Sequence, residues 1–442
     1  MNDLCLFIWP SKQAICYYFL MTIYSLLLHF FLFYVSFFYT SIFASPYTLD
    51  TLTLEEKIGQ LCLISVYDPD YSSIFELIHD RHIGGTILFK SARFPHSLSV
   101  KNKLISIQTE SQSKLPIFTS IDHEGNGLGR SATAFPRMMA LGYIDDTHLT
   151  KRVGQIMGIE LKNAGIDIVY GPVLDVNISV ENTVIGSRSF SDSRKHVAKH
   201  GKAFISGVES AGVIPVAKHF PGHGLTTQDS HVDLPVSNHN KDTISKYALY
   251  PFKKNINVPM IMSAHIYYSK LDPIHPATLS KTILSDLLRN DLGYNGVVIT
   301  DHMDMKAVRK DRSIEEVCLQ ALLAGADMLM LGGNISQINK IMDALIEAVH
   351  NGTLPMSRVN EAVGRILDLK QLYLSDTPNN IDAIDASGHQ EIALEVLSRS
   401  THINTIKHSS PPSSDYHNLT FISAPSAAST TIYQPLTDAN FD

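Results

Sequence analysis

Short apolar runs alternate with longer amphipathic stretches through most of the chain. The apolar runs occupy residues 61–66, 85–89, 117–121, 166–174, 213–217, 260–264, 297–300 and 328–331. Strands that are almost continuously apolar are typical of a parallel sheet that is covered on both faces. The sequence therefore predicts eight buried strands in a parallel arrangement.

Helical patterns fill the intervals between these runs. The clearest amphipathic stretches cover residues 146–164, 194–211, 281–291 and 313–324, and Thr53 with Glu56 forms a capping-box pattern before the first run. A strand followed by a helix, repeated eight times, predicts an α/β fold of the (β/α)8 TIM type. A doubly wound open sheet is the structural alternative. Such sheets usually have fewer strands and a glycine-rich phosphate loop after the first strand, which this sequence lacks.

The N-terminal 47 residues are a separate, largely apolar segment. Residues 14–49 contain no Asp, Glu, Lys or Arg, and an uncharged run of this length can cross a membrane. The run exceeds the apolar core of about 7–15 residues in a cleaved signal peptide, although cleavage after Ala44 fits the local sequence. We expect residues 1–47 to be a signal or membrane anchor of an exported protein, periplasmic or membrane-anchored. The alternative is a cytoplasmic protein with a spurious N-terminal extension.

The composition changes near residue 376, which we take as the end of a barrel domain covering residues 48–376. Residues 338–349 and 356–374 predict helices that close the barrel. The following residues, 377–442, are rich in Ser, Thr, Pro and Asn.

Within this C-terminal tail, residues 388–400 have a helical pattern, and residues 402–406 and 418–423 have strand patterns. A segment of this size has little core of its own. From Gly388 it resembles only the start of a second α/β domain found in longer members of the family described below, and this resemblance implies a short, truncated or residual remnant of that domain.

Charge and cysteine content narrow the possible functions. The 36 Lys and Arg residues are outnumbered by 43 Asp and Glu residues, so no basic surplus is available for a nucleic-acid partner. Cys62 and Cys318 lie in apolar surroundings without the spacing of a zinc site. We interpret both as buried core thiols.

Polar residues follow the predicted strands at their C-terminal ends. In a barrel these ends meet at one mouth, where barrel enzymes carry their chemistry. The residues are Asp122, Asp175, Lys218 with His219, His265, Asp301 and Asn334. Any one of them taken alone could be a structural hydrogen-bonding residue. Their recurrence after six strands is what indicates a site.

The most specific motif is Lys218-His-Phe-Pro-Gly-His-Gly224, followed by Asp229-Ser-His231. Pro221 and Gly222 rule out the helical turn that would place both histidines of the first motif on one metal, so no metal site is predicted. Lys218 could form a Schiff base or donate hydrogen bonds to substrate hydroxyls. Asp229 is close enough to orient the His231 imidazole for proton transfer, and the alternative is a surface loop without a role.

Carboxylates and cations gather at the same predicted mouth. Asp301 ends the seventh strand, where a lone carboxylate could be a nucleophile, a base or a substrate anchor. Asp122 and Arg130 follow the third strand and Arg188 follows the fourth, a combination suited to gripping hydroxyl groups. With neither a phosphate loop nor a metal cluster in the sequence, this set favours a neutral sugar and no cofactor.

These segments resemble glycoside hydrolase family 3, in particular its NagZ-type β-N-acetylhexosaminidases, from residue 54 to about residue 376. The resemblance implies that Asp301 is the catalytic nucleophile and that His231, paired with Asp229, is the general acid/base. This is a retaining mechanism with a covalent glycosyl-enzyme, in which an imidazole replaces the usual second carboxyl. The resemblance also implies that the sugar is held by Asp122, Arg130, Arg188, Lys218 and His219.

The sequence departs from the family pattern at two sites within the barrel. The family's Glu-Gly-Gly-Arg reads Glu124-Gly-Asn-Gly127, and its Asp-Asp after the seventh strand reads Asp301-His302. The first change removes a loop glycine and an arginine at the rim of the sugar site. The second keeps the nucleophile and changes its neighbour.

Three hypotheses follow from this resemblance. The first is a retaining exo-β-N-acetylglucosaminidase that acts on N-acetylglucosamine-containing muropeptides, the carbohydrate partner of the protein. The second is a phosphorolytic β-glycosidase, since a histidine acid/base does not repel phosphate as a carboxylate would. The third is a membrane-tethered muropeptide-binding protein that has lost turnover.

Overall fold

A computed structural model describes residues 48–66, 72–88, 115–125, 132–179, 182, 184–226, 234–309, 312–374 and 386–401. Eight parallel strands form a closed barrel in the order β1-β10-β9-β7-β5-β4-β3-β2. The (β/α)8 prediction is thus confirmed, and each predicted run overlaps one barrel strand. The strands are β1 (Cys62–Val66), β2 (Gly85–Leu88), β3 (Phe118–Ile121), β4 (Ile168–Val169), β5 (Ile214–Phe220), β7 (Met260–Ser263), β9 (Val297–His302) and β10 (Met328–Leu331).

Three strands differ from their predicted lengths by more than one residue. β4 has only two residues, and Val173 beyond it makes an isolated bridge to Lys218. β5 and β9 run past their apolar stretches, so that Lys218, His219 and Asp301 are strand residues. The register shifts beside both extensions, between Ala217 and Phe220 on β5 and opposite the end of β9 on β10. A polar residue ends an apolar run in the sequence, but the strand can continue through it because its backbone still pairs with the neighbouring strands.

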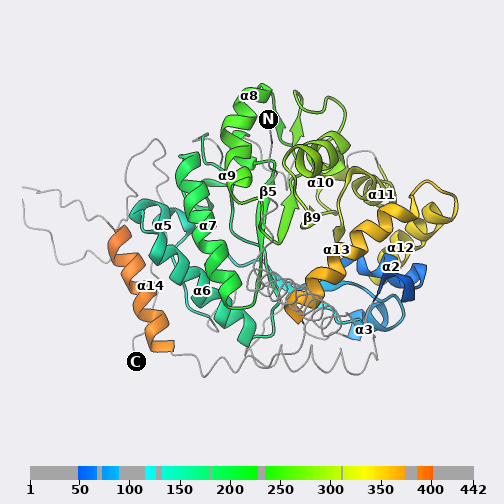
Figure 1. The fold of residues 1–442 in the computed structure, drawn as a ribbon, viewed down its shortest axis with the longest axis horizontal. Helices are drawn as coiled ribbons and strands as arrows, with labels where there is room; N and C mark the ends of the chain where they lie inside the picture. The colour runs from blue at the N-terminus through cyan, green and yellow to red at the C-terminus, as the bar shows by residue number, and fades with distance from the viewer. Residues whose placement is uncertain are drawn as a thin grey trace, which may run out of the picture. The chain divides into compact units, whose positions relative to one another are not determined.

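Helices cover the outside of the barrel (Figure 1). The capping boxes at Thr53 and Ser313 are formed, and the predicted helix over 281–291 is wound as a π-helix at Thr282–Asp291. The main α-helices are α2 (Leu54–Gln60), α3 (Ser72–His79), α5 (Met138–Ile144), α6 (Thr147–Asn163), α7 (Arg194–Ser210), α9 (Leu249–Lys254), α11 (Ile314–Ala324), α12 (Ile335–His350) and α13 (Met356–Leu374). The short elements α8 (Lys241–Thr243), α10 (Lys306–Arg309) and the β6 (Val236–Ser237) and β8 (Tyr267–Tyr268) pair lie in the connections.

The predicted C-terminal helix is present as α14 (Ala386–Ser400). It lies along α5 and α6 (Figure 1) and buries Ile392, Ala393 and Val396. The tail therefore adds core to the barrel, more than its composition led us to expect. The two predicted tail strands, over 402–406 and 418–423, lie outside the described residues.

The N-terminal 47 residues also lie outside the described part of the chain, so the signal or anchor and the proposed domain boundaries stay predictions. Among the helices that are described, none combines the length and the apolar character needed to cross a bilayer.

Cys62 and Cys318 are both buried free thiols, as predicted. Burial raises the pKa of Cys62 to about 12. These thiols thus lack the thiolate character of reactive cysteines.

A buried ion cluster joins α13 and the π-helix Thr282–Asp291 to the N-terminal end of β10. The fully buried Asp327 carboxylate accepts hydrogen bonds from Arg358 at 2.7 Å, from Arg365 at 3.0 Å and from Arg289. It also accepts the backbone N–H of Val298 at 2.9 Å. One carboxylate therefore neutralises three cations from two helical segments, α13 and the π-helix, at the end of the barrel opposite the mouth.

Replacing Asp327 with Ala should lower the free energy of unfolding by about 3–5 kcal/mol, because three guanidinium groups would lose a buried partner. The matched control is Asp343→Ala. Asp343 pairs with Arg81 at 2.6 Å but is 65% exposed, and such surface pairs contribute about 0–1 kcal/mol. Urea unfolding of both variants measures the difference, and equal losses would contradict the structural role of Asp327.

Candidate active site

The structure describes five of the eight predicted site residues. Asp122 follows β3, Lys218 and His219 belong to β5, and Asp301 belongs to β9. Arg188 ends a short 3-10 turn, Gly186–Arg188, in the connection after β4. These elements deliver the five residues to the C-terminal end of the barrel. The remaining predicted residues, Arg130, Asp229 and His231, lie outside the described residues.

Glu124 joins the charged residues on one side of the mouth. Its carboxylate accepts two hydrogen bonds from Arg188, from Nε and Nη2, each at 2.8 Å. Lys218 Nζ lies 2.8 Å from the same carboxylate, and Arg137 Nη1 lies 3.7 Å from it. Burial alone would raise the pKa of Glu124, but Lys218 and Arg188 outweigh burial and hold it well below its usual value. Glu124 is therefore an ionised carboxylate shared by three cations, and we call it the hub of the mouth. In the sequence it stood out only as part of a motif.

Lys218 is a buried cation held between two carboxylates. Its Nζ donates to Asp122 Oδ1 at 2.7 Å and lies close to Glu124. Burial would lower the pKa of Lys218, but Asp122 and Glu124 raise it above its usual value. A Schiff-base lysine needs a neutral amine, so this geometry disfavours the aldolase-like alternative and favours a charged hydrogen-bond donor.

Asp122 differs from Glu124 in its exposure. The Asp122 side chain is 53% exposed, whereas that of Glu124 is 9% exposed. Asp122 thus keeps carboxylate surface open to a ligand while it is bound to Lys218. The predicted role of Asp122 as a hydroxyl acceptor fits this position.

Asp175 orients the two histidines of the most specific motif. This fully buried carboxylate accepts His219 Nδ1–H at 2.7 Å and the backbone N–H of His223 at 2.5 Å. Burial would raise the pKa of Asp175, but His219 lowers it below its usual value. Because a carboxylate only accepts, the proton must be on Nδ1 of His219.

The second histidine of the motif, His223, is a neutral, buried group. Burial lowers its pKa to about 4, and its Nδ1 lies 3.1 Å from Thr226 Oγ1. Within the described ranges, no group of three or more His, Cys, Asp or Glu residues is arranged to hold a metal ion.

Asp301 lies near the end of β9 as a partly buried carboxylate that stays ionised. Burial alone would raise its pKa, but His265, His219, the His302 N–H and Lys218 together lower it to about 2. The backbone N–H of His302 donates to Asp301 Oδ1 at 2.7 Å. An ionised carboxylate at this position is chemically competent as a nucleophile.

Two histidines, His265 and His302, make hydrogen bonds that hold the end of β9 beside Asp301. His265 Nε2 donates to the carbonyl oxygen of His302 at 3.1 Å, while its Nδ1 lies 2.9 Å from Thr278 Oγ1. Burial lowers the pKa of His265, which keeps its ring neutral. The His302 ring contacts Ser65 Oγ of β1 at 2.9 Å through Nε2. The departure from the family's Asp-Asp pair is therefore accommodated by a cross-barrel hydrogen bond.

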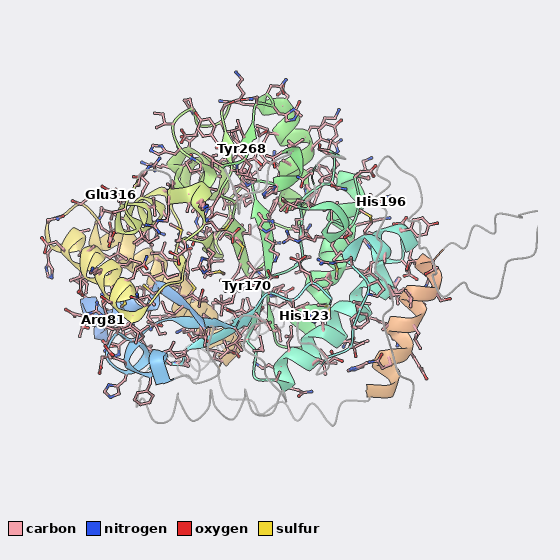
Figure 2. All side chains as sticks on the ribbon, turned by 180° about the vertical axis from the view of Figure 1, so that it is seen from behind. Arg81, His123, Tyr170, His196, Tyr268 and Glu316 are labelled. Atoms are coloured by element: carbon pink, nitrogen blue, oxygen red, sulfur yellow. The ribbon has the colours of Figure 1, made fainter. Side chains whose placement is uncertain are left out.

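Tyr170 lies in the middle of the barrel with His123, away from the peripheral Arg81, His196 and Glu316 (Figure 2). Its hydroxyl lies 3.0 Å from Ser120 Oγ. Burial, together with the charges of Asp122 and Asp301, raises the pKa of Tyr170. A neutral, fully buried ring thus fills the interior near both carboxylates.

Comparisons with known proteins identify relatives of this chain. Beta-hexosaminidase A of Pseudoalteromonas piscicida is 35% identical over 325 residues, covering 67% of this chain and 54% of that protein. The chain thus spans about half the length of this relative. A beta-hexosaminidase of Nitrosomonas eutropha is 32% identical over 305 residues, covering 66% of this chain and 86% of that protein.

A solved structure and a family model extend the comparison to the fold. The structure of a glycoside hydrolase family 3 beta-N-acetylglucosaminidase from Paenibacillus sp. matches with a TM-score of 0.76 at 33% identity, over 81% of this chain and 71% of that chain. The family model described as the glycosyl hydrolase family 3 N terminal domain matches residues 53–369. The chain therefore belongs to glycosyl hydrolase family 3 and is a glycosidase by its family, with relatives named beta-hexosaminidases.

Proposed function

We propose that the protein is a retaining exo-β-N-acetylglucosaminidase that works through a covalent glycosyl-enzyme. The observation that carries the proposal is Asp301, a partly buried carboxylate with a pKa of about 2 at the C-terminal end of the seventh barrel strand. The names of the relatives support the choice of sugar. These relatives are named beta-hexosaminidases, and the proposal adds to that name the sugar, the exo mode of cleavage and the retaining mechanism.

In the proposed mechanism Asp301 attacks the anomeric carbon while a general acid protonates the departing oxygen. The same group then removes a proton from water as that water hydrolyses the glycosyl-enzyme. From the sequence motif, we assign both proton transfers to His231. Asp229 would orient the His231 imidazole for them. An imidazole has an ordinary pKa of about 6.5, so it can give and take a proton near neutrality.

The proposed sugar-binding group is a set of fixed donors and acceptors. Lys218 stays charged between Asp122 and Glu124, and Asp175 fixes the tautomer of His219. Hydrogen bonds to charged groups are stronger than those between neutral groups. The expected ligands of the sugar hydroxyls are Asp122, Arg130, Arg188, Lys218 and His219.

We further propose that the natural substrates are muropeptides with terminal N-acetylglucosamine and that the protein acts outside the cytoplasm. The second proposal rests on the uncharged run over residues 14–49. Release of nitrophenol from a panel of aryl β-glycosides tests the activity, with the N-acetylglucosaminide expected to react fastest. No release at all would favour a binding protein. Faster release in phosphate than in a non-nucleophilic buffer, with a sugar phosphate as product, would favour phosphorolysis.

Asp301→Ala should reduce kcat by roughly 10⁴-fold or more, because no other group would form the covalent bond. A 2-deoxy-2-fluoro or related mechanism-based sugar should label the wild-type protein at Asp301, as located by peptide mass spectrometry. A label on the nearby Asp304 would contradict the assignment.

His231→Ala should slow hydrolysis most for substrates with poor leaving groups. A nitrophenolate leaves with little protonation, whereas a sugar alkoxide needs an acid, and general acid/base catalysis contributes roughly 10²–10⁴-fold. The variant should therefore lose far more rate on a disaccharide than on an aryl glycoside, with a smaller loss of the same kind for Asp229→Ala. Equal losses on both substrates would show that His231 is not the acid/base.

Glu124→Gln should lower the free energy of unfolding at about pH 7, with a smaller deficit in acid. The pKa of Glu124 is lower in the folded than in the unfolded chain, so its contribution is present above the ordinary value of 4.5 and is lost as the pH falls below it. Urea unfolding at a series of pH values measures the gap. Glu391→Gln, at an exposed position on α14, is the control and should follow the wild type.

A further inference from the structure

A buried carboxylate on α6 connects the C-terminal helix to the polypeptide after β3. Glu160 is 7% exposed and accepts hydrogen bonds from both sides. Thr133 donates its backbone N–H to Oε2 at 3.0 Å and its hydroxyl to Oε1 at 2.6 Å. From α14, His389 Nδ1 lies 2.9 Å from Oε1. The same carboxylate is therefore shared by two segments that are far apart in the sequence.

The segment anchored by Thr133 leads to the charged hub of the mouth. Phe135 donates its backbone N–H to Gly125 O at 3.0 Å. Gly125 has a φ of +114°, and a Cβ there would lie 2.8 Å from Phe135 O, so only glycine permits this close approach. Arg137, two residues on, lies 3.7 Å from Glu124. Residues 132–137 thus contact the backbone of Gly125, which follows Glu124, and the Glu124 side chain itself.

We propose that α14 is a positioning element of the active site, with His389 acting through Glu160 and Thr133 on Glu124. The effect on substrate rests on the proposed function, while the mechanical connection does not. His389 covers the Glu160 carboxylate and supplies one of its donors. In a water-poor site the two Thr133 bonds are stronger than they would be in solvent. Loss of His389 therefore loosens residues 132–137 and, through them, the orientation of Glu124 and its cations.

The structure offers a matched control at the other end of α14. Arg399 Nη1 and Nη2 both lie 3.1 Å from Asp146 Oδ2, in a pair whose side chains are about a third or more exposed. Asp146 caps the start of α6 and makes no hydrogen bond to residues 132–137 among the described contacts. Arg399→Ala therefore loosens α14 without touching the Glu160 connection.

The first measurement is amide hydrogen exchange on the full chain, followed by peptide mass spectrometry. His389→Ala and Thr133→Val should both speed exchange in peptides covering residues 132–137, including the Phe135 amide. His389→Asn should restore protection, because its amide nitrogen replaces the Nδ1 donor. Arg399→Ala should leave these peptides at the wild-type rate. This readout needs no substrate, so it stands even if the proposed activity fails.

The second measurement is kinetic, on the aryl N-acetylglucosaminide at a temperature well below unfolding. His389→Ala should raise KM by roughly 2- to 10-fold, the range that one lost hydrogen bond supplies, with kcat nearly unchanged because Asp301 on β9 is not touched. His389→Asn should restore KM, and Arg399→Ala should not change it. Unaltered exchange in His389→Ala would overturn the connection. Faster exchange with an unaltered KM, or the same KM change in Arg399→Ala, would overturn the positioning role.

Discussion

The Glu124 carboxylate is the interaction on which the rest of the mouth depends. It draws together Lys218 from β5, Arg188 from the connection after β4 and the polypeptide that follows β3. A buried lysine without a partner would lose its proton, since burial penalises the charged form. With Glu124 and Asp122 beside it, Lys218 stays charged, and that charge in turn helps to lower the pKa of Asp301 across the barrel. The ionised state of the proposed nucleophile is therefore linked to a carboxylate that is itself almost completely buried.

The barrel could be predicted from the sequence because its information is local. Each apolar run overlaps a strand, and the capping boxes at Thr53 and Ser313 mark the starts of helices. The errors were made where tertiary pairing decides the outcome. β5 continues through Lys218 and His219 because its neighbours β4 and β7 still offer ladder partners, with a register shift that absorbs the irregular backbone. This pairing cannot be predicted from the polar residues themselves, because it depends on strands that are distant in the sequence.

The site residues that directly follow the apolar runs could also be predicted from the sequence. Asp122, Lys218, His219 and Asp301 follow apolar runs, so the barrel geometry alone brings them to one mouth. Glu124, Asp175 and His265 were harder to assign, because their importance lies in partners that are distant in the sequence, such as Arg188 at a separation of 64 residues. Glu124 had one usable signal, its place in the motif that carries Asp122. The contact of His302 with Ser65 had none, since 237 residues separate the two.

The two sides of the mouth are held by different kinds of interaction, and this bears on how the protein responds to pH. The β3 and β5 side is held by ion pairs, and the β9 side is held by hydrogen bonds of the His265 and His302 imidazoles. Asp301 has a pKa of about 2, His223 has a pKa of about 4, and the pKa of Lys218 is raised. These three groups keep one charge state from about pH 5 to pH 8, where ordinary imidazoles titrate. The nucleophile and the buried lysine thus keep their charges through this range. A proton carrier must change its charge in each catalytic cycle, so it has to be a group other than these three. This requirement is consistent with the assignment of that role to His231 from its sequence motif.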